Sequence, residues 1–170
     1  AGDNCVAGGL LVQTGPDADG NGVIDSVSDE DFVCNQAPRE LEADVAIEAP
    51  EDVAQLANVQ DLDGDLIVRG TALADLDLAS LRRVRGDVVI SDNADLTNID
   101  LSGLERVDGW LSVEGNGGGD IDLSGLERVD EHLYVGEHPR LDSLDVGSLD
   151  HVRGDLIIST NSAAVLILGD

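Results

Sequence analysis

Apolar residues recur along this chain at a period of 22 or 23 residues. The eight residues Leu-Ser-Gly-Leu-Glu-Arg-Val-Asp occur unchanged at 101–108 and again at 123–130. Three apolar columns follow the same spacing. The first is Leu56, Leu78, Leu101, Leu123 and Val146, the second is Val59, Leu81, Leu104, Leu126 and Leu149, and the third is Leu62, Val84, Val107, Val129 and Val152. A fixed period in the range of roughly 20–50 residues indicates an architecture of stacked repeats.

Each repeat also carries apolar triplets of the kind that form short β-strands. A first set of triplets starts at positions 45, 66, 88, 111, 133 and 156. The second set is Leu76-Asp77-Leu78, Ile99-Asp100-Leu101, Ile121-Asp122-Leu123, Leu144-Asp145-Val146 and Val165-Leu166-Ile167. Side chains alternate along a strand, so the outer members of each triplet face inward and the middle member faces solvent. The second set therefore predicts an outward ladder of aspartates, which either binds Ca²⁺ between rungs or forms a solvated acidic face.

These segments predict an all-β fold in which residues 45–170 form a parallel β-solenoid of about six rungs. A single rung cannot bury its apolar side, whereas a stack of rungs forms one continuous core. A helical leucine-rich repeat is the competing interpretation. The segment Leu-Ser-Gly-Leu-Glu-Arg-Val is too short for a stable helix and has a central Gly, so it forms one helical turn at most.

Residues 1–37 carry no repeat and predict a separate small module, joined to the solenoid by a linker at 38–44. The centre of the module matches the first half of an EF-hand-type loop, where oxygens at alternate positions converge on Ca²⁺. Ser28 stands where such a loop has a bidentate Glu, so Asp29 would complete the site only in a lengthened loop. The predicted Ca²⁺ ligands are Asp17, Asp19, Asn21, Val23 (through its carbonyl), Asp25 and Asp29. The alternative is a turn without an ion, since Asp, Asn and Gly favour turns by themselves.

The two cysteines of the chain, Cys5 and Cys34, bracket this module and have no other cysteine to pair with. A single disulfide between them is the simplest interpretation, and it favours a secreted or cell-surface location. The first residue is not Met and no signal peptide precedes the module, which predicts a processed mature chain. No apolar run approaches the ~20 residues that a membrane-spanning helix needs, so no membrane span is expected.

The chain is strongly acidic, with 36 Asp and Glu residues against nine Arg, no Lys, and a formal net charge of −27. Such a field repels nucleic acid and attracts basic ligands and cations. An apolar content of 42% excludes a disordered chain. The charge therefore predicts a folded protein whose partners are not nucleic acids.

The phrase Leu-x-x-Leu-x-x-Val-x-Gly-x-Leu-x-Val-x-x-Asn-x-x-Leu, which runs through Leu78–Leu96 and through Leu101–Asn116, resembles the receptor L domain. The resemblance covers about residues 43–168 and implies a right-handed leucine-rich β-solenoid. Residues 1–37 resemble a small Cys-bounded module of secreted bacterial proteins, on the two Cys, the Gly8-Gly9 pair and the Asp/Asn/Gly run. That second resemblance implies an extracellular location and a calcium loop, but no activity.

One predicted face of the solenoid is apolar despite the acidic composition. The residues expected on it, which we predict to bind a partner, are Ile67, Val89, Trp110, His132, Tyr134 and Ile157. Exposed apolar patches edged by charge are typical of interfaces. The alternative is that a loop or the N-terminal module covers this face. We expect Trp110 and Tyr134 to lie close together because they belong to adjacent rungs.

No enzyme signature is present: the chain has no nucleophile elbow, no phosphate-binding loop and no suitably spaced His/Cys/acid set. The sequence stops after the apolar residues Val165, Leu166, Ile167 and Leu168, which predicts an open solenoid end able to associate. The favoured hypothesis is a calcium-stabilised structural or adhesive protein of the cell surface that assembles head to tail with itself or with other extracellular surface components. The alternative is an extracellular binding module that recognises a protein or glycan through Trp110 and Tyr134. A polysaccharide-active β-helix enzyme is a distant third hypothesis.

Overall fold

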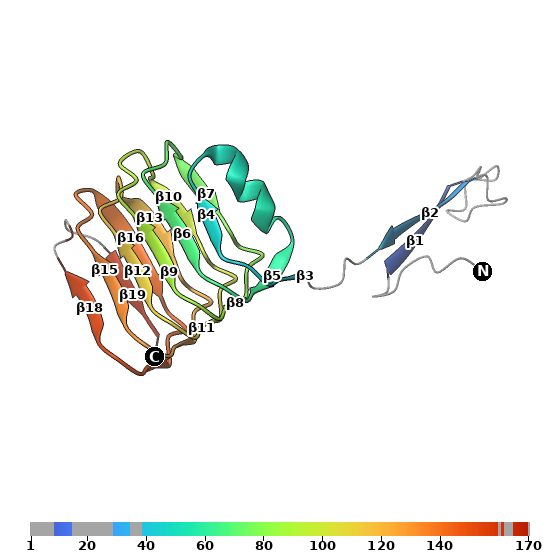
Figure 1. The fold of residues 1–170 in the computed structure, drawn as a ribbon. Helices are drawn as coiled ribbons and strands as arrows, with labels where there is room; N and C mark the ends of the chain where they lie inside the picture. The colour runs from blue at the N-terminus through green and yellow to red at the C-terminus, as the bar shows by residue number, and fades with distance from the viewer. Residues whose placement is uncertain (1–8, 15–28, 35–38, 160, 162–164, 170) are drawn as a thin grey trace. The chain divides into compact units, whose positions relative to one another are not determined.

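The computed structural model describes residues 9–14, 29–34, 39–159, 161 and 165–169, and the chain divides into two compact units, 1–37 and 38–170. In the first unit β1 (Gly9–Thr14) pairs antiparallel with β2 (Asp29–Cys34). The second unit is a parallel β-solenoid of about six rungs with very little helix (Figure 1). The solenoid that the repeat period predicts is therefore confirmed.

Three parallel sheets surround the core of the solenoid. Sheet I consists of β3 (Arg39–Leu41), β5 (Val59–Leu62), β8 (Arg83–Val84), β11 (Arg106–Val107), β14 (Arg128–Val129) and β17 (His151–Val152). Sheet II consists of β4 (Val45–Ile47), β6 (Leu66–Arg69), β9 (Val88–Ser91), β12 (Leu111–Glu114), β15 (Leu133–Gly136) and β18 (Leu156–Ser159). Sheet III consists of β7 (Asp75–Asp77), β10 (Asn98–Asp100), β13 (Gly119–Asp122), β16 (Leu141–Val146) and β19 (Val165–Leu168).

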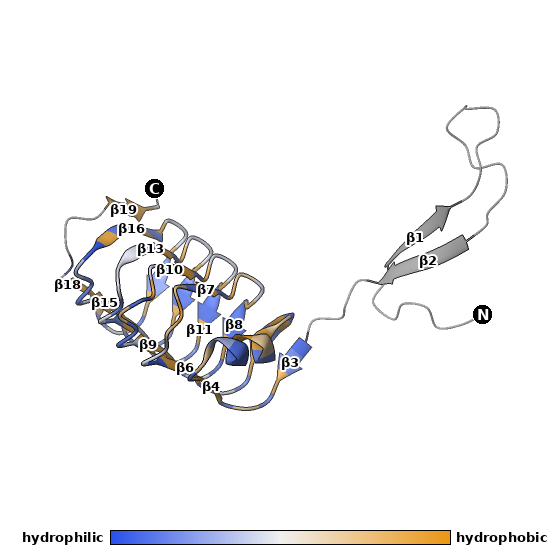
Figure 2. Ribbon diagram, turned by 90° about the horizontal axis from the view of Figure 1, so that it is seen from above, coloured by the Kyte–Doolittle hydropathy of each residue, from blue (hydrophilic) through white to orange (hydrophobic). Residues whose placement is uncertain are grey.

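The core is a stack of identical apolar positions, one above another. In sheet II, Leu111 pairs in register with Val88 on one side and Leu133 on the other, and all three side chains are fully buried. In sheet III the same relation holds for Ile99 and Ile121. Burying one Leu, Ile or Val side chain contributes about 1.5–3 kcal/mol to folding, so the repeated columns are the main source of stability. Figure 2 shows the hydrophobic strand β19 at one end of this stack and the hydrophilic strands β8 and β11 of sheet I.

The first rung differs from the others, because a 3-10 helix, η1 (Pro50–Leu56), stands where later rungs have a strand of sheet III. The Asp52 carboxylate accepts hydrogen bonds from the amides of Glu48 (3.1 Å) and Ala49 (2.9 Å) and so fixes the start of the helix. Leu56 is buried in the core cluster. Helix η1 thus packs at the end of the solenoid that lies opposite β18 and β19 (Figure 1). The apolar pattern of the sequence does not predict this helix.

Two strands depart from the expected arrangement. β3 lies in the stretch that the sequence analysis assigns to a linker, and it pairs with β5 through Leu41 opposite Leu62. A three-residue strand with one apolar residue shows no alternation, which is why the pattern does not predict it. In β19, Leu166 rather than Val165 pairs with Leu144, one residue later than expected. Four consecutive apolar residues carry no period-2 signal, so they do not specify the register.

The corners of the solenoid require residues that allow close stacking. At the turn before sheet II, a Cβ added to Gly86 would lie 2.6 Å from the carbonyl oxygen of Gly64 in the preceding rung, so a side chain there would require the backbone to shift. At the turn after sheet II, one residue in each of four successive rungs adopts the left-handed conformation with φ between 59° and 62°. These residues are Gly70, Asp92, Gly115 and Glu137. The rungs therefore follow the same path even where the residue type changes.

A column of buried amides lies directly after this left-handed corner. The Asn116 side chain donates to the carbonyl of Ile90 (3.0 Å) and accepts from the Asn93 side chain (2.9 Å). Asn93 repeats the pattern one rung earlier, donating to the carbonyl of Val68 (3.1 Å) and accepting from the Thr71 amide (2.8 Å). Each asparagine thus satisfies backbone groups of the corner and links its rung to the next, as buried polar groups must.

His138 takes the place of an asparagine in this column. Its amide donates to Asn161 Oδ1 (3.2 Å), and its Nε2 donates to the Val113 carbonyl (3.1 Å). Its Nδ1 is buried and has no hydrogen-bond partner among the described residues. Burial lowers the pKa of His138 below its ordinary value, although interactions with the backbone of Val113 and of Asn116 oppose that shift. The imidazole is therefore neutral in the folded protein, and its second nitrogen is left unsatisfied.

We predict that His138→Asn stabilises the solenoid, and more so in acid. An asparagine would restore the repeated hydrogen bonds and remove the orphaned nitrogen, which costs about 1–3 kcal/mol when buried. Because folding lowers the pKa of His138, the unfolded chain binds the proton first, and the native protein loses stability as the pH falls below about 6.5. The free energy of unfolding is measured by urea denaturation at pH 8 and at pH 5. It should be higher for the variant than for the native chain at both pH values, and the difference should be larger at pH 5. An equal gain at the two pH values would contradict the assignment of a neutral buried imidazole.

Candidate ligand-binding site

One residue in the outward-facing column of sheet II is smaller than the residues on either side of it. Ala46, Ile67, Val89, Ser112, Tyr134 and Ile157 are neighbours in register on successive strands. Their side chains face away from the core, because the residues on either side of each, such as Leu111 and Val113, are fully buried. Ser112 is the small polar member of this otherwise largely apolar column, and it is only 6% exposed.

A hollow of about 370 Å³ lies over Ser112. Trp110 and Glu114 precede and follow it by two residues on the same strand, and Val89 and Tyr134 flank it on β9 and β15. Residues two apart on a strand point to the same face, so four larger side chains surround one short side chain. The residues that line the hollow are Arg69, Val89, Trp110, Ser112, Glu114 and Tyr134.

Trp110 forms one wall of the hollow and stands in a column that otherwise supports the corner. In this column the carboxylates of Asp44, Asp65 and Asp87 each accept a hydrogen bond from the amide of the next rung, at 2.8–2.9 Å. An indole cannot accept such a bond, and within the described residues the amide of His132 in the next rung has no side-chain acceptor. Trp110 is 45% exposed, so its presence is not explained by packing in the core.

His132 fixes the position of the indole from the neighbouring rung. The two rings meet edge to face, with centroids 6.0 Å apart and an interplanar angle of 65°. The Nδ1 atom of His132 accepts a hydrogen bond from the Asp155 amide (2.9 Å), which resumes the ladder that Trp110 interrupts. The ring that packs on Trp110 is therefore held in place by the backbone of the following rung.

Tyr134 forms the opposite wall, and its direction is set by a glycine. A Cβ added to Gly136 would lie 2.5 Å from the Tyr134 hydroxyl oxygen, so the phenol ring lies over the bare backbone of Gly136. Gly136 pairs in register with Glu114. The phenol therefore leans along its strand toward the Glu114 side of the hollow.

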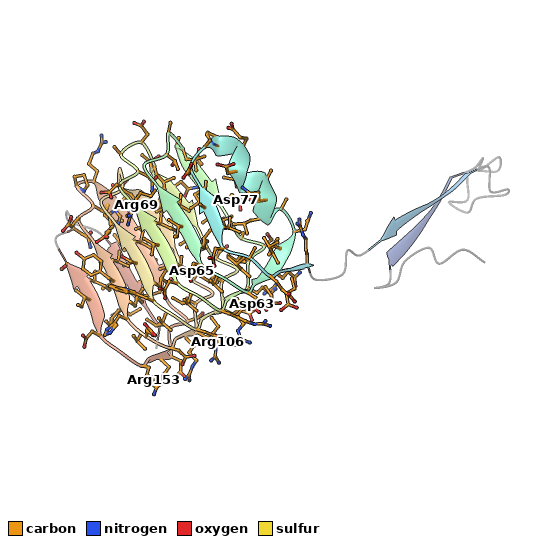
Figure 3. The ribbon with its side chains drawn as sticks, in the orientation of Figure 1. Asp63, Asp65, Arg69, Asp77, Arg106 and Arg153 are labelled. Carbon is orange, nitrogen blue, oxygen red and sulfur yellow. The ribbon has the colours of Figure 1, made fainter. Side chains whose placement is uncertain are left out.

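Two charged side chains stand at the rim of the hollow. Arg69 is tied to its own corner, since Nε donates to Ser91 Oγ (2.8 Å) and lies 4.0 Å from the Asp92 carboxylate. Figure 3 shows Arg69 and Asp65 at the two ends of β6. The Glu114 carboxylate has no ion pair and no hydrogen bond within the described part of the chain. The hollow thus combines two aromatic walls with one unpaired carboxylate.

The aspartate ladder of sheet III has a structural explanation. Asp77, Asp100, Asp122 and Asp145 are neighbours in register, as the alternation predicts. Each carboxylate accepts a hydrogen bond from the amide two residues later, at 2.8–3.1 Å, which stabilises the turn that follows. No group of three or more His, Cys, Asp or Glu side chains with the geometry of a metal site occurs among the described residues.

Arginines and aspartates pair along sheet I. Arg83 and Arg106 both bind the Asp108 carboxylate at 2.5 Å, and Asp130 is bound by Arg106 and Arg128. Although partial burial acts to raise it, the pKa of Asp108 is held below its ordinary value by hydrogen bonds from the two guanidinium groups. These guanidinium groups are therefore occupied with carboxylates of the same sheet.

The structure brings together some of the predicted partner-binding residues and separates others. Trp110, Tyr134 and Val89 line the hollow, and His132 supports it from behind. Ile67 and Ile157, which are 38% and 43% exposed, belong to the same column but lie outside the hollow. Sequence reasoning missed the roles of Ser112, Glu114 and Arg69. The signal for Ser112 is that it is the one serine in a column of otherwise apolar or aromatic residues.

The remaining predicted sites are only partly within the described residues. The disulfide of Cys5 and Cys34 and the calcium ligands Asp17, Asp19, Asn21, Val23 and Asp25 lie outside them, apart from the backbone of Cys34 and of Asp29 in β2. The predicted assembly end is described: Val165 and Leu168 are each 63% exposed, and Leu166 and Ile167 are each 43% exposed. No helix among the described residues is long and apolar enough to cross a membrane.

Comparisons with family models, with curated proteins and with solved structures find no match to this chain. The resemblances to the receptor L domain and to the Cys-bounded module therefore stay predictions.

We predict that Trp110→Asn is more stable than Trp110→Ala. Both variants remove the indole, but only asparagine can accept the hydrogen bond from the His132 amide that the ladder lacks at this rung. The difference should be about 0.5–1.5 kcal/mol, the usual net contribution of one hydrogen bond. Thermal and urea unfolding of the two variants measures it directly. Equal stabilities would show that the ladder contributes nothing at this corner.

Proposed function

We propose that this protein is a non-enzymatic extracellular binding module of an adhesive or structural surface protein, and that the hollow over Ser112 is its recognition site. The observation that carries the proposal is the hollow itself, where the outward column of sheet II drops to a serine between two aromatic walls. A concave site with apolar walls and a few polar groups is the usual form of a ligand site.

The residues around the hollow support recognition rather than folding. At Trp110 the chain gives up a corner hydrogen bond that an aspartate would make. At Ser112 it gives up the apolar contact that a β-branched residue makes elsewhere in the column, as Val89 and Ile67 do. Aromatic residues are enriched at the centres of interfaces because they bury a large area with little loss of side-chain entropy.

The proposal predicts that Ser112→Ile abolishes ligand binding and leaves the fold intact. Isoleucine already occupies this column at Ile67 and Ile157, so the sheet accommodates it, yet it fills the hollow. Trp110 is the only tryptophan of the chain, so its fluorescence reports on the site without a label. The probes are a chitin trisaccharide, a galacturonic acid trisaccharide, and capped Gly-Gly-Arg-Gly-Gly and Gly-Gly-Glu-Gly-Gly peptides. At least one should change the emission of the native chain and not that of the variant; no change with any probe contradicts the proposal.

The N-terminal unit and the location of the protein belong to the same proposal. We propose that residues 1–37 form a Cys5–Cys34 disulfide-linked module that binds Ca²⁺, as in secreted proteins, and that the array is a right-handed coil of the receptor L-domain kind. Crossovers between parallel strands are right-handed in nearly all proteins, which supports that handedness. Three carboxylates within the nine residues 17–25 repel one another unless a cation is bound, which supports the ion.

Head-to-tail assembly is the second candidate function. The observation that favours it is the exposure of the last rung: Leu156 is 49% exposed, whereas its column neighbour Leu133 is fully buried. Such a rung presents apolar side chains to a partner.

The assembly proposal predicts concentration-dependent sedimentation in calcium that Leu166→Asp abolishes, because the substitution places a charge in the exposed rung. Ala46→Asp, on the outer face of the first rung, is the control and should not alter it. In the same buffers, chelation should lower the thermal unfolding temperature of the native chain. A native chain that stays monomeric at high concentration in calcium contradicts assembly, and an unchanged unfolding temperature after chelation contradicts the calcium site.

A further inference from the structure

We infer that the hollow over Ser112 binds a cationic side chain, an arginine or lysine carried by a basic segment of a partner protein. This inference rests on the proposed function, because it names the ligand class of the same site. It depends on three features of sheet II: the carboxylate at the rim, the two aromatic walls and the limited size of the hollow.

A carboxylate lies at the rim of the hollow. Glu114 projects from β12 beside the hollow, and it makes no ion pair and no hydrogen bond within the described residues. The acids of sheet I differ in this respect: Asp108 and Asp130 are each bound by two arginines. A carboxylate without a partner at the edge of a partly enclosed site attracts a cation more strongly than one in open water, because the local dielectric is lower.

The positive group in the hollow does not cancel this charge. Arg69 is held on Ser91 and faces Asp92, and it lies two strands away from Glu114 in the same register row. Neighbouring strands are about 4.8 Å apart, so the backbones at Arg69 and Glu114 are roughly 10 Å apart, with Ser91 between them. Among the described residues no ion pair joins Arg69 to Glu114, and the guanidinium is engaged by Ser91 and faces Asp92.

The aromatic walls provide the second element of recognition. Trp110 and Tyr134 border the floor residue Ser112 from two directions, along the strand and across it. A guanidinium or ammonium group over an aromatic face within about 6 Å is stabilised by the ring quadrupole, by about 0.5–2 kcal/mol. A cation on Ser112 therefore meets two ring systems and, toward the side where the Tyr134 phenol leans, the Glu114 carboxylate.

Size and charge distinguish this ligand from the competing ones. A hollow of about 370 Å³ is near the lower limit for small-molecule sites and suits one side chain. The formal charge of −27 repels an anionic peptide or an acidic polysaccharide and steers a basic segment toward the surface. A neutral glycan would gain nothing from the unpaired carboxylate beyond hydrogen bonds.

The test compares two variants of the full chain that lose the same charge. Glu114→Gln removes the carboxylate at the hollow, and Glu127→Gln removes one from the sheet I side, away from the site. The probe is capped Gly-Gly-Arg-Gly-Gly, followed by the emission of Trp110, with the Gln-centred peptide as its neutral counterpart. We expect Glu114→Gln to weaken binding of the Arg peptide about tenfold and Glu127→Gln to change it less than twofold. Tyr134→Leu should also weaken it, since leucine fills space without a π face.

Four outcomes overturn the inference in distinguishable ways. If the chitin trisaccharide binds in a Ser112-dependent manner and the Arg peptide does not, the binding module stands and the cationic ligand is wrong. If the Glu- and Arg-centred peptides bind equally, charge is not recognised. If the two Gln variants weaken binding equally, the peptide responds to the overall charge and not to the hollow. If no probe changes the emission of Trp110, the proposed function fails together with the inference.

Discussion

In-register hydrogen bonding between parallel strands is the constraint from which the rest of this solenoid follows. Each rung contacts only its two neighbours. The N–H and carbonyl groups of each strand must therefore meet carbonyl and N–H groups of the corresponding strand in the next rung. That requirement favours the same path in successive repeats: a glycine such as Gly86 at the turn before sheet II, a left-handed residue after four strands of sheet II, and an aspartate that supports the turn after four strands of sheet III. The core columns are then aligned as a consequence, and their burial provides most of the stability.

The same constraint makes departures from the repeat informative. His138 replaces an asparagine and leaves a buried nitrogen without a partner in the described structure, which costs stability and makes the fold sensitive to acid. Trp110 replaces an aspartate of the corner ladder, and Ser112 replaces a larger apolar residue. The last two departures occur side by side and create a hollow, whereas His138 stands alone in the interior of the corner. A cost to folding that coincides with a shaped surface is the stronger indication of function.

Charge is distributed over the solenoid according to structural use. Several carboxylates serve the fold: the aspartates of the corner ladder and of the sheet III ladder accept backbone hydrogen bonds, and Asp108 and Asp130 are bound by arginines. Their negative charge is thereby partly compensated by the fold. Glu114 has no such partner among the described residues, so it is available to a ligand.

The repeat period, the inward columns and the aspartate ladder could all be predicted from the residues alone, because one strict spacing of 22–23 positions determines which side chains meet. Tyr134 and Trp110 were identified for the same reason, because they are aromatic residues at repeat positions where the other rungs carry other residue types. Local patterns did not predict η1, β3 or the register of β19, since a short 3-10 helix, a strand with one apolar residue and an unbroken apolar run lack a diagnostic period. Nor could they predict that Ser112 lies under the hollow, that Gly136 directs the phenol of Tyr134, or that Glu114 lacks a partner while Asp108 has two. Those features depend on side chains from different rungs meeting in space, which only the stacked structure decides.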